Sequence, residues 1–213
     1  MAISINGTTG ISGVDGSASA PALTGTDSNT GITFPSADTI KLSTAGVERM
    51  SITNNGVSAT GHILQVVQTY KTDSTSQSGN SSTVFYDISG MSASITPSSS
   101  SNKVLVMWTA QVASSGASSR GNIIRLLRGS TEIGSGTGGS STNGQVYHRT
   151  VQYNPETKNM MYLDSPNTTS ATTYKLQWSV EGSGGSATTY FLNDNSGGSF
   201  GITSHITLME VAA

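Results

Sequence analysis

The sequence predicts an all-β protein with an N-terminal extended arm, a short β-rich neck through which identical chains associate, and a C-terminal antiparallel β-sandwich of jelly-roll type. Three observations predict this. Apolar and polar residues alternate over strand-length segments, which is typical of half-buried strands. Turn-forming residues separate those segments at the spacing of a sandwich. No segment shows the 3.6-residue apolar period of an amphipathic helix. The expected parts are residues 1–26, 27–61 and 62–213.

Composition narrows the class of protein further. Charged residues make up only 10% of the chain, and the net charge is −2. A disordered chain usually carries a high net charge and few strand-forming residues, so a folded β protein with a hydroxyl-rich surface fits better. The scattered basic residues predict no nucleic-acid partner, and the apolar runs are too short to span a membrane. The chain has no cysteine, which excludes disulfides and thiolate metal sites.

Residues 1–26 are rich in glycine and small polar residues, and they cannot form a core alone. The segment has no basic and apolar pattern of a signal peptide, so none is expected. We expect it to be an arm held by a partner, with packing onto its own chain as the alternative. The expected anchoring residues are its apolar side chains: Ile3, Ile5, Ile11, Val14 and Leu23.

Residues 27–61 read as short strands separated by tight turns. Ala45-Gly46 is the expected hairpin turn, and Asn55-Gly56 is a strong two-residue turn signal. Strands this short bury too little to be stable alone, so we expect identical chains to supply the missing burial. The expected trimer contacts in the neck are Ile32, Phe34, Ile40, Leu42, Met50 and Ile52.

The residue pattern over 62–213 predicts a β-sandwich. Lys103–Ser114 alternates strictly, with Val104, Val106, Trp108, Ala110 and Val112 facing inward. Leu105 and Met107 on its other face predict further trimer contacts. Tyr174–Glu181 is a second alternating strand, with Tyr174, Leu176, Trp178 and Val180 inward. We also expect a polar loop over 72–82 and a hairpin that joins 84–88 to 91–95 around Ser89-Gly90.

The stretch PALTGTDSNTGITFPSADTIKLSTAGVERMSITNNGV resembles a short β-module of tail-fibre and other virion proteins of tailed bacteriophages. The shared features are D-x-N-T-G-I, P-x-A-D-x-I, G-x-E-R-M and a closing N-G. Further along, ILQVVQTYKTDSTS, ITPSSSSNKVLVM, IRLLRGSTEIG, DSPNTTSATTYKLQW and ITLMEVAA resemble, as an ordered set, the C-terminal knobs of fibre-like virion proteins in phages of marine and freshwater bacteria. The resemblance covers most of residues 21–213 and implies a homotrimeric virion protein.

No residue pattern predicts catalysis, a cofactor or a metal. A serine nucleophile needs a base and an orienting acid, and no such local set exists. His62, His148 and His205 have no partner at metal-ligand spacing, although a three-fold axis would gather three copies of one histidine. Asp194 lies in an oxygen-rich loop that suits calcium, but no second acid follows it. We therefore expect no enzyme activity.

Surface recognition has two candidate sets. Aromatic side chains near polar loops suit sugar stacking, with packing at the core edge as the favoured alternative; these are Tyr147, Tyr153, Tyr162 and Tyr190. The loops concerned are 74–82, 135–143 and 193–199. An arginine patch with Glu132 or Glu156 is the second set, and ordinary surface ion pairs are favoured for it; its members are Arg120, Arg125, Arg128 and Arg149.

The expected function follows from these parts. A chain of this length makes a stubby appendage, which favours a capsid decoration or cement protein on the virion surface. Its expected partners are two further copies of itself and the major capsid protein, bound through the arm. The alternative is a receptor-binding protein of the tail that recognises a host surface glycan.

Overall fold

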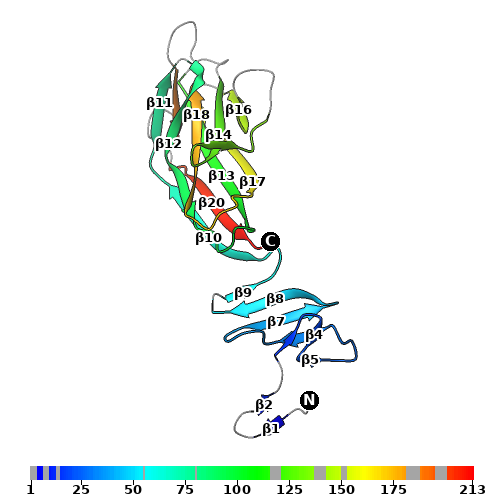
Figure 1. Ribbon diagram of the computed structural model, residues 1–213. Helices are drawn as coiled ribbons and strands as arrows, with labels where there is room; N and C mark the ends of the chain where they lie inside the picture. The colour runs from blue at the N-terminus through cyan, green and yellow to red at the C-terminus, as the bar shows by residue number, and fades with distance from the viewer. Residues whose placement is uncertain are drawn as a thin grey trace. The chain divides into compact units, whose positions relative to one another are not determined.

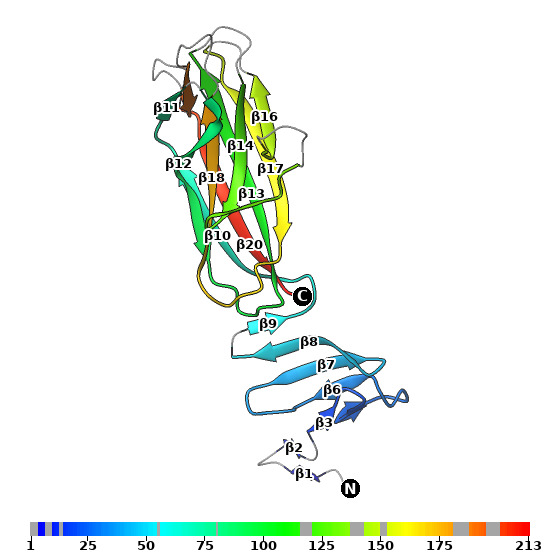
Figure 2. The same cartoon turned by 45° about the horizontal axis from the view of Figure 1, so that its top comes forward.

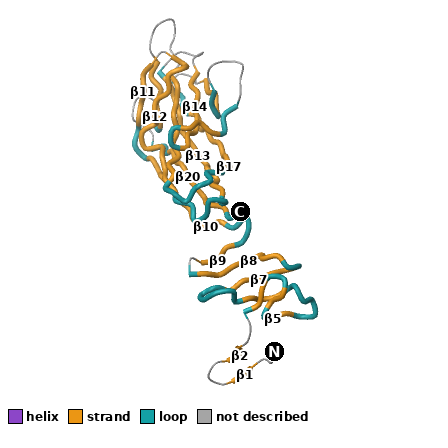
Figure 3. The backbone as a smooth tube through the Cα atoms, viewed as in Figure 1, coloured by secondary structure: helices purple, strands orange, loops and turns teal. Residues whose placement is uncertain are grey.

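The computed structural model describes residues 4–6, 10–12, 15–54, 56–79, 81–115, 121–136, 143–149, 153–180, 188–194 and 201–213. The regular structure in these ranges is entirely β, as Figure 3 shows. No helix among them is long and apolar enough to cross a membrane. The chain divides into two compact units, Met1–Leu64 with Val211–Ala213, and Gln65–Glu210.

The first unit is built on one antiparallel sheet. Its order follows the chain: β5 (Leu23–Thr24), β6 (Gly31–Thr33), β7 (Ile40–Thr44), β8 (Val47–Thr53) and β9 (Gly56–Ser58) (Figures 1 and 2). Two separate hairpins precede it, β1 (Ser4–Asn6) with β2 (Gly10–Ser12), and β3 (Gly16–Ser17) with β4 (Ala20–Pro21). The predicted boundary at 26/27 falls between the paired strands β5 and β6.

The turn between β7 and β8 forms where the sequence predicts it. Ala45 and Gly46 have φ angles of 52° and 73°. Two consecutive positive φ angles are the signature of a type I′ turn, whose twist matches that of a β-hairpin. The prediction of a hairpin centred on Ala45-Gly46 is confirmed.

The second unit contains two facing sheets (Figures 1 and 2). The first consists of β10 (Ile63–Lys71), β11 (Thr75–Gly79), β13 (Lys103–Ser114), β17 (Glu156–Asp164), β19 (Thr188–Leu192) and β20 (Ser204–Val211). The second consists of β12 (Ser81–Ile95), β14 (Gly121–Arg128), β15 (Thr131–Ile133), β16 (Val146–Arg149) and β18 (Thr172–Val180).

The strand order is that of a jelly roll. β19 and β20 both pair with β13, so together they fill one strand position beside it. β11 pairs with β19 and β10 pairs with β20, so β10 and β11 together fill the next position. The first sheet then has the order β10/β11, β20/β19, β13, β17, and the second has β12, β18, β14, β15/β16. From one strand position to the next along the chain, the polypeptide crosses to the other sheet every time except between β14 and β15/β16. This is the eight-position, double Greek-key arrangement of a jelly roll, so the predicted fold class is confirmed.

The core lies between these two sheets. The five predicted inward residues of β13 and the four of β18 are each at most 1% exposed, which confirms the alternation that predicted them. Trp108 and Trp178 are the largest of these side chains, and Trp108 Nε1 donates a hydrogen bond to Gln145 Oε1 at 2.8 Å. Ile206 and Leu208 of β20 extend the same core.

The predicted hairpin over 84–95 is wrong. Both halves belong to one strand, β12, which pairs with β18 on either side of an irregularity between Asp87 and Ser92. Gly90 has a φ of 80° in this bulge and lies beside the buried Lys71 side chain. A Ser-Gly dipeptide whose glycine has a positive φ occurs in β-bulges as well as in turns, so the dipeptide alone did not distinguish the two.

The predicted loop over 72–82 is also wrong, because it contains β11. This edge strand pairs with β19 in register from Thr75↔Leu192 to Gly79↔Thr188. The Ser78 and Thr189 hydroxyls lie 2.6 Å apart across the pair. Backbone pairing and hydroxyl contacts hold this strand without an apolar alternation.

Candidate functional site

The most distinctive surface of the first unit is an apolar sheet face. One row runs directly across four strands, because the register aligns Leu23 with Ile32, Ile32 with Leu42, and Leu42 with Met50. A second row joins Ile40, Ile52 and Val57 across three strands, and its residues alternate with the first row along the same face. We call these two rows, with Phe34 beside them, the apolar face.

The apolar face is open to solvent. Six of its side chains are 37–41% exposed, whereas Ile32 and Met50 are half-buried; the six are Leu23, Phe34, Ile40, Leu42, Ile52 and Val57. Contiguous exposed apolar side chains of this kind usually mark an interaction site. All six neck residues predicted as trimer contacts belong to this face, and Leu23, predicted as an anchor, lies there as well. Val57 also belongs to it and was missed, although the alternation in GVS after the turn indicates it.

The opposite face of the same sheet is polar and partly covered. Lys41 and Glu48 form an ion pair there at 2.6 Å. Thr33 and Ser43 are each only 2% exposed. Pro21 lies against Gly31 on this side. The sheet therefore has one side closed by its own chain and one side left apolar and exposed.

A groove of about 430 Å³ lies at one end of the apolar face. Its apolar residues are Phe34, Ile40 and Ile52. Its polar residues come from the β6–β7 connection and from the end of β8, and they are Ser36, Asp38, Thr39, Thr53 and Asn54. Asn54 Nδ2 donates to Asp38 Oδ2 at 3.2 Å, which joins the two sides of the groove.

The jelly roll carries a second apolar patch on the outer side of its first sheet. Leu105 lies opposite Leu163, and Met107 lies opposite Met161. Leu163 and Met161 are 47% and 68% exposed. Sequence analysis identified the two β13 residues but not their β17 partners, because only the strand register brings them together.

The outer side of the second sheet is polar and satisfied internally. Arg125 bonds Gln177 and Glu132, and its guanidinium lies 3.7 Å from the centre of the Phe85 ring. Asp87 accepts from Gln177 and Lys175, and these contacts hold the pKa of its carboxyl below the ordinary value. This side is therefore polar where these residues lie, and its exposed aromatic residue among those described is Tyr147 of β16, which pairs with Ile123.

The remaining predicted arm residues are only partly described. Ile5 and Ile11 are cross-strand partners in the β1–β2 hairpin. Ile3 and Val14 lie outside the described residues.

The histidines and acids form no metal site among the residues that the structure describes. His62 Nδ1 lies 3.1 Å from the Val57 carbonyl oxygen, and His205 stacks on Tyr70. The side chain of His148 and the loop after Asp194 are outside the described residues.

The structure separates the four candidate tyrosines. Tyr190 is fully buried and Tyr162 packs against the core, whereas Tyr147 and Tyr153 are 57% and 44% exposed. Tyr153 also has a φ of 56°, which is uncommon for a bulky side chain. Two of the four thus meet the exposure that sugar stacking requires. The loops 137–142 and 195–199 lie outside the described residues.

Within the described residues, the candidate arginines form separate ion pairs, the favoured expectation, and not a patch. Arg125 does pair with Glu132, at 2.9 Å. Arg128 instead binds Asp164, and Glu156 pairs with Lys158. Arg120 and the side chain of Arg149 are outside the described residues.

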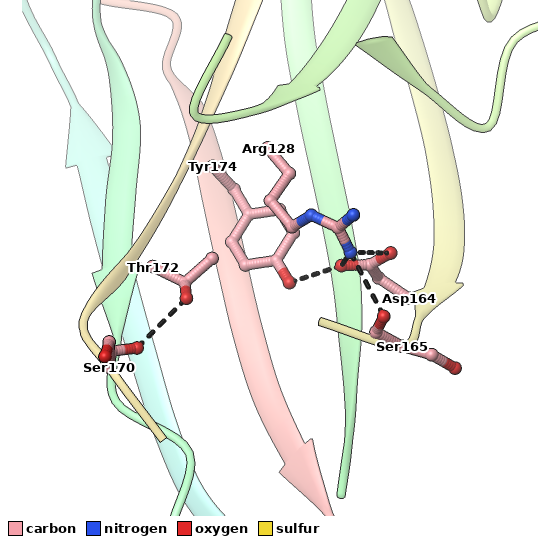
Figure 4. Close-up of polar contacts among 6 residues, drawn as sticks. All are labelled: Arg128, Asp164, Ser165, Ser170, Thr172 and Tyr174. Atoms are coloured by element: carbon pink, nitrogen blue, oxygen red, sulfur yellow. Dashed lines mark hydrogen bonds and ion pairs between the residues drawn. The ribbon is translucent and has the colours of Figure 1, made fainter. Parts of the chain in front are cut away.

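Two buried carboxylates that the sequence did not indicate hold the jelly roll together. Asp164 accepts from Tyr174 Oη at 2.6 Å and from Arg128 Nη1 at 2.9 and 3.0 Å, which joins β17 of one sheet to β14 and β18 of the other (Figure 4). Burial and the Asp164 carboxylate together raise the pKa of the Tyr174 hydroxyl well above its ordinary value. Glu210 is 1% exposed and accepts hydrogen bonds from Gln65, Ser98 and Asn102.

No protein-family model and no curated protein matches this chain. Among solved structures, three forms of the infectious bursal disease virus protein VP2 align with a TM-score of 0.37. The subviral particle is 11% identical over 82% of this chain and 47% of that chain. The Gt strain structure is 13% identical over 82% and 48%, and the T=1 particle is 12% identical over 94% and 54%. This chain spans about half the length of those proteins, and at this TM-score the likeness carries no argument about function.

Proposed function

We propose that this chain is a homotrimeric structural protein of a tailed-phage virion, which decorates the capsid and is anchored by its N-terminal residues. The observation that carries the proposal is the open apolar face of the first unit. A single sheet of short strands with one apolar side gains stability only when that side is covered. Two further copies would supply the cover, and the resemblance of residues 21–57 to virion β-modules supports this role.

Burial of the apolar face supplies a driving force for assembly, which acts against a cost of at least about 4 kcal/mol of lost translational and rotational freedom. Full burial of a large apolar side chain is worth about 1.5–3 kcal/mol, so burial of the exposed part of each face residue is worth about 0.5–1 kcal/mol. Six such side chains give about 3–6 kcal/mol per chain. The second patch, around Met107 and Met161, would add a contact between jelly rolls. Shell binding would then stabilise the assembled capsid by mass action.

The first prediction tests the trimer. Replacing Leu42 and Ile52 with threonine keeps strand-forming residues but removes apolar contact from both rows. We expect the native chain to form trimers and the L42T/I52T variant to be monomeric at micromolar concentration, measured by size exclusion with light scattering. The matched control is K41T/E48T on the polar face, which should remain trimeric. A monomeric native chain would refute the proposal.

The second prediction tests the anchor. Residues 15–24 bond directly to the five-stranded sheet, since the Asp15 carbonyl accepts from Phe34 N and Leu23 pairs with Ile32, so the informative deletion removes residues 1–14 only. We expect gold-labelled antibody to mark the heads of virions that carry the full chain, and to mark no virions that carry the truncated chain, which should still form trimers. Equal labelling of heads by both chains would contradict the anchoring role.

A second candidate function is recognition of a host glycan by a tail protein. The exposed rings of Tyr147 and Tyr153 favour it, because aromatic faces stack on sugar rings. Antibody label confined to the tail would favour this function over capsid decoration.

A further inference from the structure

In the first unit, Arg49 and the exposed carboxylates of Asp15 and Asp38 have no ion-pair partner among the described residues, and of these Asp38 and Arg49 border the apolar face. The Lys41–Glu48 pair is satisfied within the chain, and the Asp27 carboxylate is bonded within its own turn by Asn29 and Thr30. Asp38 instead accepts only a long bond from Asn54, and Arg49 donates through Nε to Thr44 Oγ1 at 2.9 Å. Both side chains are exposed.

These two charges lie at opposite ends of the apolar face. Arg49 occupies a bulge, since Leu42 pairs with Met50 while Ser43 pairs with Glu48. Its contact with Thr44, which shares a face with Ile40 and Leu42 by alternation, places the guanidinium on the apolar side. Asp38 lies at the far end of β7, in the rim of the groove. Five strand residues span roughly 15 Å, so the two charges cannot pair within one chain.

The groove at one end of the apolar face and the β7–β8 turn at the other end are complementary in shape and polarity. The groove at the Asp38 end has an apolar floor of Phe34, Ile40 and Ile52. At the Arg49 end, Val47 is 50% exposed and lies opposite Thr44 on the apolar face. A cation and an apolar side chain at one end therefore match a carboxylate and an apolar groove at the other.

We propose that copies of this chain join head to tail, with Arg49 of one copy paired to Asp38 of the next and Val47 entering the groove of the next. This deepens the proposed trimer and rests on it. A two-fold contact brings identical patches together, whereas a cyclic three-fold assembly brings two different patches of each copy together. The separated charges suit the second arrangement. The ion pair fixes the register between copies and disfavours same-end contacts.

The absence of native cysteine makes crosslinking a direct test. An arginine–aspartate pair spans more than a disulfide does, so a short bismaleimide is the appropriate reagent. We expect D38C/R49C to give covalent species of up to three chains and none larger. D38C alone and R49C alone should give no linked species, and a mixture of the two should give a linked pair. The control K41C/E48C should link only within a chain.

A double-mutant cycle then tests the ion pair itself. Asp38→Asn removes the charge but keeps a residue that tolerates the φ of 55° at this position. We expect D38N and R49Q each to raise the concentration for half association about tenfold, and D38N/R49Q to raise it little further. Fluorescence of Trp108 and Trp178 checks that the jelly roll remains folded.

The outcomes separate the two proposals. A native chain that does not trimerise refutes the proposed function and this inference together. Three outcomes with a native trimer refute the head-to-tail contact alone: D38C or R49C crosslinks to its own kind, D38N and R49Q leave the association concentration unchanged, or the effects of D38N and R49Q on that concentration are fully additive.

Discussion

Replacing Asp164 with alanine is expected to destabilise the jelly roll by about 3 kcal/mol. Asp164 is 4% exposed and is the shared acceptor of the cluster in Figure 4. Its loss leaves the fully buried Tyr174 hydroxyl without its acceptor and leaves the Arg128 guanidinium without a carboxylate. Removal of one partner of a buried pair costs more than the pair contributes, because the remaining groups stay desolvated.

Urea unfolding followed by tryptophan fluorescence measures this effect, because both tryptophans lie in the jelly-roll core. The control is Asp87→Ala, which removes a carboxylate that also pairs with a cation but has a side chain 56% exposed. An exposed pair is worth at most about 1 kcal/mol, so D87A should change stability little. Equal effects of D164A and D87A would show that Asp164 does not act as a buried link between the sheets.

The alternation of β13 and β18 predicted the jelly-roll core because these strands lie in the middle of their sheets. Each has a neighbour on both edges, so burial dictates every second side chain. Edge strands obey no such constraint. β11 is held by backbone pairing and by the Ser78–Thr189 contact, and its sequence looks like a loop. The short strand β15 after the Gly129 turn was missed for the same reason.

The candidate site was predictable in part. Alternation predicts, without knowledge of the structure, that Ile40 and Leu42 share one face of their strand and that Met50 and Ile52 share one face of theirs. What the sequence did not show is that all four lie on the same face of the hairpin. A regular hairpin around Ala45-Gly46 would pair Leu42 with Arg49, and the β7–β8 bulge puts Met50 in that position instead. Buried acids such as Asp164 likewise need the sheet order before their partners can be identified.

The other large effect is expected at Glu210, which is buried without a cation among the described residues. Its two carboxylate oxygens accept four hydrogen bonds: from Gln65 Nε2 and Asn102 Nδ2 at 2.6 Å, and from Ser98 N and Oγ at 2.7 and 2.8 Å. Burial by itself would raise the pKa of this carboxyl, but the hydrogen bonds outweigh burial and hold the pKa below the ordinary value of 4.5. The cluster therefore depends on the charged form.

The sign of the pH dependence follows from that direction. A folded-state pKa below the unfolded one contributes stability above the unfolded pKa, and this contribution is lost as the pH falls through the folded pKa. Glu210→Gln replaces one acceptor oxygen with a donor, which faces either the Gln65 donor at the Oε2 position or the Ser98 and Asn102 donors at the Oε1 position. We expect E210Q to be less stable than the native chain by about 2–3 kcal/mol at pH 7. The difference should narrow as the pH falls below about 4.5, because the unfolded chain then binds a proton that the folded carboxyl resists, and it should be smallest once the folded carboxyl is protonated as well.

Unfolding in urea at a series of pH values between 7 and 3 measures that difference directly. The comparison with E210Q matters more than the native curve, because Asp87 and other carboxyls titrate in both chains and cancel. Glu48→Gln, an exposed carboxyl in the other unit, should leave the whole tryptophan-detected series unchanged. A stability gap that stays constant or widens toward pH 3 would mean that the charged form of Glu210 does not stabilise the jelly roll, and that its hydrogen bonds do not compensate for its burial.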